Sequence, residues 1–109
     1  MLKLDPKRVD GLLAMGRVEI ELDNAQSGLD YLNRAQTMAI ELGNDEEKAQ
    51  ILQAIGVAYS VLNKPQDALQ SFQQSLEIKR RLGLKKGIAD SLEMIGQMEA
   101  CLLYTSRCV

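Results

Sequence analysis

Apolar residues recur at intervals of three and four positions along most of the chain, with polar residues between them. Such spacing places the apolar side chains on one face of a helix. Two of these stripes are Leu52, Ile55, Tyr59 and Leu62, and then Leu69, Phe72, Leu76 and Ile78. The pattern predicts an all-α chain of about five helices, over residues 7–22, 26–42, 45–62, 66–82 and 86–102.

Residues that favour helix ends stand between the predicted helices. Pro65 suits the first turn of a helix, where its missing N–H costs nothing. Gly43 and Gly83 suit a left-handed C-cap, and Asn44 or Asp45 can cap the helix that follows the first of them. Connections this short predict that consecutive helices pack as antiparallel neighbours.

The chain repeats itself with a period of forty residues. Gly16, Gly56 and Gly96 are forty positions apart. The segments around them align without gaps, and they are Leu12–Leu22, Leu52–Leu62 and Leu92–Leu102. A glycine inside a helix costs up to ~1 kcal/mol relative to alanine. Its repeated use therefore predicts a close approach of the partner helix at these positions.

The repeated positions resemble the tetratricopeptide repeat family, whose pattern sets large apolar residues, Gly, Tyr, small residues and an aromatic at fixed offsets. The second period carries Leu52, Ile55, Gly56, Tyr59, Ala68, Phe72 and Ser75. The first carries Leu12, Met15, Gly16, Glu19, Gly28, Leu32 and Ala35, and the third carries Leu92, Ile95, Gly96 and Glu99. The resemblance implies antiparallel helix-turn-helix pairs stacked as an α-solenoid, a superhelix whose concave face is lined by the first helix of each pair.

The forty-residue period is longer than the 34 residues usual in the family. This longer form resembles arrays in motor-protein light chains and in bacterial regulators fused to kinase or transcription modules. We divide residues 1–102 into the end of a preceding repeat (1–8), repeat one (9–48), repeat two (49–88) and the first helix of repeat three (89–102), and we treat 103–109 as a non-repeat tail. Neither end carries a polar capping helix, so we expect a fragment of a longer array.

Composition and charge exclude several classes of function. The formal net charge is −2, from 13 basic and 15 acidic residues, which gives no general attraction to nucleic acid. There is no His, the commonest metal ligand and the side chain most used in acid–base catalysis. We therefore expect a chain that is not an enzyme and uses no cofactor or metal. No apolar run is long enough to span a membrane, and Cys101 and Cys108 form no disulfide framework, so a cytoplasmic location is expected.

The alignment nominates residues for the concave face. They are Asp10, Leu13, Arg17 and Glu21 from repeat one, Gln50, Gln53, Val57 and Ser60 from repeat two, and Asp90, Glu93 and Gln97 from repeat three. This predicted surface is mixed polar and faintly acidic. Some family members hold a peptide carboxylate with Lys, Arg and Asn at such positions, but only Arg17 matches here. A peptide or partner domain held by amide hydrogen bonds and shape is expected instead; the alternative is an ordinary solvated face.

Other groups of residues have structural explanations. Asp45, Glu46 and Glu47 lie where a helix begins, and the helix dipole favours acidic residues there. Glu19 and Glu99 replace the Tyr of the family pattern, and we expect them to be partly buried. The methionines expected to fill gaps in the core are Met15, Met38, Met94 and Met98.

The stretch "IKRRLGLKKG", residues 78–87, holds five basic residues. Its counterpart in the first period is "MAIELGNDEE", residues 38–47, which is acidic. A place that is basic once and acidic once is typical of a solvated rim, so we expect the stretch to be an exposed corner between repeats. If the repeats stack in register, the basic corner lies near the acidic one.

Three functions stay open at this point. The leading one is a protein-interaction scaffold within a larger regulatory protein, which binds a protein or peptide on the concave face. The second is a non-catalytic segment of a larger enzyme such as a protein kinase. The third, which the alignment disfavours, is nucleic-acid binding through residues 79–86. No membrane partner is expected.

Overall fold

A computed structural model describes the backbone of residues 6–104 and the side chains of residues 8–100. Within these residues the chain is all-α, as predicted, and the elements are α1 (Pro6–Glu21), α2 (Ala25–Leu42), α3 (Asp45–Val61), α4 (Pro65–Leu82) and α5 (Lys85–Tyr104). Residues 6–8, which the alignment assigned to a preceding repeat, form the first turn of α1. Helix α5 continues two residues past its predicted end at 102.

The helix ends follow the local signals in the sequence. Gly43 and Gly83 end α2 and α4 with left-handed φ angles of 70° and 71°, which an L side chain would adopt only under strain. Asn44 is the residue that caps α3, because its Oδ1 accepts a hydrogen bond of 3.1 Å from the Glu47 N–H. Pro65 stands in the first turn of α4. Short connections therefore join all the helices.

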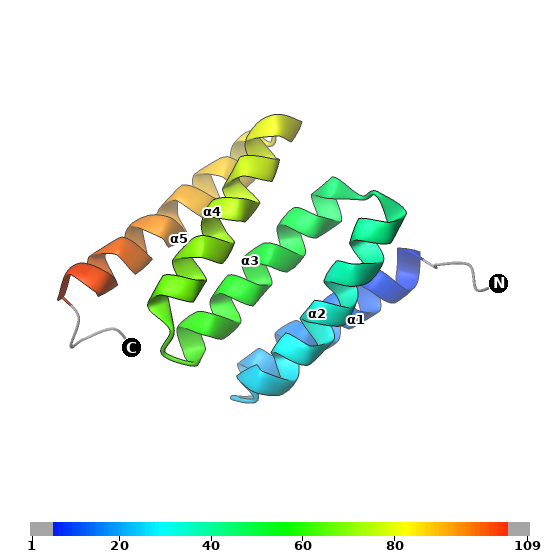
Figure 1. Ribbon diagram of the computed structural model, residues 1–109, viewed down its shortest axis with the longest axis horizontal. Coiled ribbons are helices and arrows are strands. Elements are labelled where there is room, and N and C mark those ends of the chain that lie inside the picture. Colours follow the sequence, from blue (N-terminus) through cyan, green and yellow to red (C-terminus); the bar gives the residue numbers. More distant parts are fainter. Residues whose placement is uncertain (1–5, 105–109) are drawn as a thin grey trace.

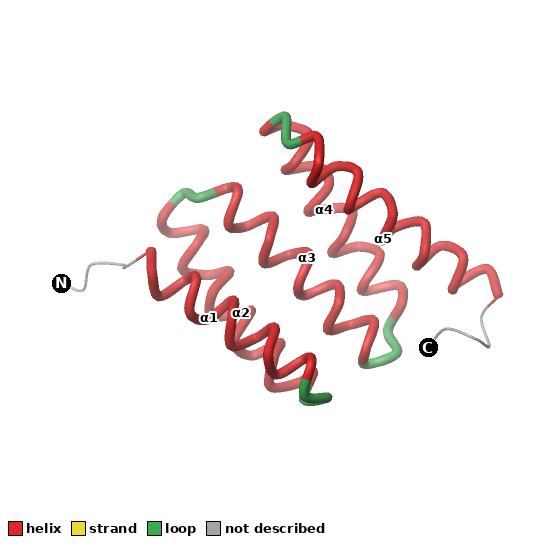
Figure 2. Tube along the Cα trace, turned by 180° about the vertical axis from the view of Figure 1, so that it is seen from behind, coloured by secondary structure: helices red, strands yellow, loops and turns green. Residues whose placement is uncertain are grey.

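Each helix packs against the next one along the chain. In Figure 1, α2, α3 and α4 are seen side by side, with α1 behind α2 and part of α5 behind α4. The same order is seen from behind in Figure 2. The pairs α1–α2 and α3–α4 share the largest contacts, and α2–α3 and α4–α5 join one pair to the next. Helices α1 and α3 also touch each other directly, so the first helices of successive pairs lie on one side of the stack.

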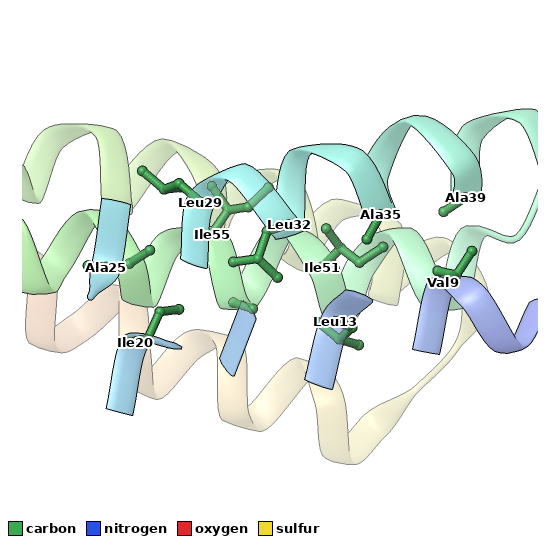
Figure 3. Close-up of a cluster of buried hydrophobic side chains, with 12 residues drawn as sticks. Val9, Leu13, Ile20, Ala25, Leu29, Leu32, Ala35, Ala39, Ile51 and Ile55 are labelled. Carbon is green, nitrogen blue, oxygen red and sulfur yellow. The ribbon is translucent and has the colours of Figure 1, made fainter. Parts of the chain in front are cut away.

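The core of repeat one is formed by branched and small side chains from three helices. Figure 3 shows Val9, Leu13 and Ile20 of α1, Ala25, Leu29, Leu32, Ala35 and Ala39 of α2, and Ile51 and Ile55 of α3. Leu13 was predicted to face the concave side, and this prediction is wrong. Its side chain is only 5% exposed and belongs to this cluster. Leu13 packs in a cluster that draws apolar residues from α1, α2 and α3, where burying an apolar side chain is favourable.

Two of the three periodic glycines confirm the predicted close approach. A Cβ on Gly16 would lie 2.8 Å from the Leu32 side chain and 3.1 Å from the Gly28 carbonyl oxygen. A Cβ on Gly56 would lie 2.5 Å from the ring of Phe72. Gly96, in contrast, has open space around its Cα hydrogens, because no second helix of repeat three is present in the described residues.

Apolar residues are exposed at both ends of the stack. Met15 is 48% exposed, whereas Ile55, forty positions later, is 5% exposed because α2 covers that face of α3. Leu92 is likewise 48% exposed, whereas its counterpart Leu52 is buried. The expectation that Met15 fills a core gap is therefore wrong, since no helix among residues 6–104 covers its face of α1. The other three methionines, Met38, Met94 and Met98, pack against the core clusters as expected.

The two glutamates that replace the Tyr of the family pattern differ in burial. Glu19 is half-buried, as expected, whereas Glu99 is exposed because no helix in the described part of the chain covers its face of α5. Within residues 6–104, none of the helices combines the length and apolarity that a membrane span needs.

Candidate functional site

A polar groove of about 660 Å³ runs along the side of the stack where the first helices lie. Its lining comes from α1, α3, the connection between α4 and α5, and the start of α5, together with Lys79 of α4. The side chains that line it include Arg17, Glu46, Gln50, Gln53, Lys79, Lys85, Lys86 and Asp90. A smaller hollow of about 150 Å³ shares Arg17 and Gln53 with it and adds Glu21 and Val57. We call the two hollows together the concave groove.

The structure places most of the nominated residues in this groove. Six of the predicted concave-face residues line it, namely Arg17, Glu21, Gln50, Gln53, Val57 and Asp90. Ser60 is half-buried, and Glu93 and Gln97 are exposed on α5, but these three do not line either hollow. Asp10 is exposed on α1. Whether any of these residues contacts a partner stays a prediction.

Lys79 is buried beneath the groove, which corrects part of the predicted exposed corner. Its side chain is 5% exposed, and its Nζ donates hydrogen bonds to Gln53 Oε1 and, at 2.9 Å, to Ser91 Oγ. Burial lowers the pKa of the Lys79 ammonium below its usual value, and the negative charge of Asp90 opposes that shift. Arg80, the next residue, is exposed, as the corner hypothesis requires.

A glycine and the helical stripe together explain why Lys79 enters the interior. Lys79 follows Leu76 by three positions and Phe72 by seven, so it falls on the apolar stripe of α4. A Cβ on Gly87 would lie 2.9 Å from the Lys79 Cδ, so the absence of a side chain there makes room for the lysine stem. The position of Lys79 within the stripe is the signal that could have revealed its burial from the sequence.

A pair of carboxyl groups, Asp10 of α1 and Glu47 of α3, lies close together outside the residues that line the groove. Burial, and then the hydrogen bond and negative charge of Asp10, raise the pKa of Glu47 to about 7, while the charge of Arg17 acts the other way. Glu47 Oε2 is buried and has no hydrogen-bond partner among the described residues. The helix dipole therefore explains the acidic cluster only in part. The sequence analysis missed the pairing because Asp10 lies on α1 and Glu47 on α3, and only the packing of these two helices brings the carboxyl groups together.

The charge of the groove differs from the predicted faintly acidic surface. Basic side chains lining the larger hollow are Arg17, Lys79, Lys85 and Lys86, and acidic ones are Glu46 and Asp90. Three of the four basic residues come from α4 and the start of α5 rather than from the nominated positions. The predicted approach of the acidic corner to the basic one is seen here, since Glu46 lines the same hollow as Lys85 and Lys86.

The described side chains that line this groove provide its shape, its charge and its amide groups rather than a reactive centre. Across residues 8–100, no three acidic, His or Cys side chains come together in a way that could hold a metal ion. Cys101 and Cys108 lie outside the residues whose side chains are described. What the arrangement can do chemically is to donate and accept hydrogen bonds and to pair with charges.

Comparison with known proteins supplies one match. A family model described as "Tetratricopeptide repeat" matches residues 9–81, which covers α2, α3, most of α1 and nearly all of α4. No curated protein and no solved structure gives a match.

Proposed function

The chain belongs to the tetratricopeptide repeat family, whose members are in general protein-interaction scaffolds, and we propose that its concave groove binds a peptide or a folded partner domain. Repeats of this kind are typically non-catalytic. The observation that carries the proposal is the polar groove built jointly by α1, α3, α4 and α5, because a surface shared by several repeats can follow an extended ligand.

The lining of the groove supports a protein ligand. Gln50 and Gln53 present amide groups that can both donate and accept hydrogen bonds, as a peptide backbone requires. Val57 adds an apolar surface in the smaller hollow. Amide groups beside an apolar patch are the combination that small binding sites in proteins use for orientation and affinity.

We further propose that the chain is part of a larger regulatory protein. The support comes from comparing equivalent positions of α1 and α3. Met15 and Val18 on α1 are exposed, whereas their counterparts Ile55 and Ala58 on α3 are buried beneath α2. A preceding helix placed as α2 is placed against α3 would cover the exposed pair. Such a protein could carry an enzyme domain elsewhere, with the described repeats acting as its binding segment in the cytoplasm.

The test uses peptides selected for binding. Random twelve-residue peptides displayed on phage are selected against the chain, and the enriched peptides are synthesised and measured by fluorescence anisotropy. Val57→Glu introduces a charge into the smaller hollow and should weaken the binding of these peptides by about tenfold or more. Ile40→Glu is the matched control, because Ile40 is an exposed aliphatic residue of α2 that lines neither hollow.

Equal weakening by both substitutions would place the bound peptides elsewhere or indicate unfolding, which circular dichroism distinguishes. Peptides that bind Val57→Glu as tightly as the unmodified chain, with the fold intact, would remove the groove from consideration. Preferential binding of a labelled twelve-nucleotide RNA, lost steeply as salt rises, would favour the nucleic-acid alternative.

A further inference from the structure

Lys79 carries a positive charge into a site where its direct partners are neutral. The acceptors of its two hydrogen bonds are the amide oxygen of Gln53 and the hydroxyl of Ser91. An ammonium group has three N–H donors, so one remains available to a ligand. Because Lys79 also lines the larger hollow of the concave groove, that ligand can come from the groove.

The stacking of the repeats does not require a buried lysine at the position of Lys79. The positions forty residues earlier than Lys79, Gln53 and Ser91 are Ala39, Leu13 and Ile51, and all three are buried apolar residues. The same architecture is thus stable with an apolar trio at the first junction between repeats. The lysine between repeat two and repeat three is therefore particular to this groove, and stacking the repeats does not depend on it.

A buried cation is stabilised by an opposite charge in contact with it. Both acceptors of the Lys79 hydrogen bonds are uncharged, and burial lowers the pKa of Lys79 while the carboxylate of Asp90 opposes that shift. Further positive charge at the same end of the groove comes from Lys85 and Lys86, both exposed in the first turn of α5. That turn contains no acidic residue, whereas the first turn of α3 contains three.

We propose that the concave groove recognises an acidic peptide, and that a carboxylate of that peptide pairs with the Lys79 ammonium while Lys85 and Lys86 attract it at the rim. The inference rests on the proposed peptide-binding function and names the chemistry of the ligand. It differs from a clamp built on the nominated concave positions, because its central cation comes from α4, the second helix of a pair.

The experiment uses the selected peptides described above, synthesised with acetylated and amidated ends. Groove-dependent peptides, defined by their weakening with Val57→Glu, should be enriched in Asp and Glu. Lys79→Met removes the ammonium and keeps the apolar stem that passes Gly87. It should weaken the binding of these peptides by about tenfold or more, since charge-assisted hydrogen bonds are the stronger class. Arg80→Gln is the matched control, because Arg80 is exposed and lines neither hollow.

A double-mutant cycle measures the coupling between Lys79 and the peptide glutamate that it is proposed to bind. Replacing the critical peptide Glu by Gln should weaken binding to the unmodified chain by a similar factor and should have little further effect on Lys79→Met. If Lys79→Met does not fold, the variant Lys79→Ala, Gln53→Leu, Ser91→Ile takes its place, because it reproduces the apolar trio of the first junction. Binding of the Glu peptide to that variant should fall to the level seen with the Gln peptide.

The outcomes separate this inference from the proposed function. Groove-dependent peptides that bind Lys79→Met at full strength, or that contain no carboxylate, overturn the inference and leave the groove as a peptide site. Displacement of the peptide by a twelve-nucleotide RNA that itself depends on Lys79 overturns it in favour of a phosphate ligand.

Discussion

Lys79 Nζ donates a hydrogen bond of 2.9 Å to Ser91 Oγ, and this buried bond joins the second helix of repeat two to the first helix of repeat three. The two side chains are 5% and 1% exposed. Gln53 accepts a second bond from the same amine, so the polar trio links α3, α4 and α5 at one point. The equivalent positions forty residues earlier are apolar, so the energetic contribution of the polar trio can be compared with that of an apolar trio within the same chain.

The first prediction concerns this trio. Lys79→Ala alone should lower the free energy of unfolding by about 2–4 kcal/mol, because it leaves a cavity and removes the donor that Ser91 and Gln53 share. Combining it with Gln53→Leu and Ser91→Ile should restore the free energy of unfolding or raise it by about 1–3 kcal/mol, as apolar replacements of buried polar networks often do. Urea denaturation at equilibrium measures both. A triple variant less stable than the single one would show that the two junctions are not equivalent.

The second prediction uses two glycines as a matched pair. Gly56→Ala should destabilise the chain by about 1–3 kcal/mol, because its Cβ would lie 2.5 Å from the ring of the buried Phe72. Gly96→Ala should stabilise it by up to ~1 kcal/mol, because no neighbouring atom is close and alanine favours the helix. Thermal unfolding followed by circular dichroism distinguishes the two. Shifts of the same sign would contradict the packing of α3 against α4.

The third prediction is a pH dependence that arises at Glu47. The pKa of Glu47 is raised to about 7 from an ordinary value of 4.5, so between these values the folded chain holds a proton that the unfolded chain has lost. The contribution of Glu47 is therefore most favourable at pH 4 and is lost as the pH rises toward 7. Glu47→Gln removes this loss and should raise stability at pH 8 by on the order of 1 kcal/mol, after allowance for screening by water.

The control for this pH dependence is Glu77→Gln, an exposed glutamate of α4 that is not among the groups acting on the pKa of Glu47. The informative quantity is the difference in the free energy of unfolding between each variant and the unmodified chain at each pH. That difference should change more between pH 4 and 8 for Glu47→Gln than for Glu77→Gln. A difference that stays constant for Glu47→Gln would contradict the assigned carboxyl pair of Asp10 and Glu47.

The fourth prediction tests the exposed end of the stack. Met15→Glu should change the free energy of unfolding by no more than about 0.5 kcal/mol, because Met15 is 48% exposed. Ile55→Glu, at the equivalent position of the next repeat, should cost about 3 kcal/mol or more, since it places an unpaired carboxylate beneath α2. The comparison is made by urea denaturation at pH 8. A comparable cost at the two sites would mean that the Met15 face is already covered, for example by a second copy of the chain, which light scattering would reveal.

Helix positions and the repeat could be predicted from the sequence because their causes are local. Spacings of three and four residues define the buried stripe of each helix, and Gly43, Asn44 and Pro65 act on the backbone within one turn of their own position. The glycine prediction also held where the partner helix is present, at Gly16 and Gly56, because the cost of a glycine within a helix is independent of the rest of the chain.

The groove required the three-dimensional arrangement, because its character depends on which helices meet. Leu13 and Gln53 occupy the same position of the repeat, yet Leu13 joins the core while Gln53 lines the groove. Lys79 belongs to a basic stretch that was predicted to be an exposed corner, and it enters the interior because Gly87 leaves space for its stem and Ser91 Oγ accepts a hydrogen bond from its ammonium. The helices, their period and the resemblance to the repeat family could be predicted from local spacing along the chain. Where charge is buried was set by the packing between repeats, since burial depends on neighbours that lie a helix or more away along the chain.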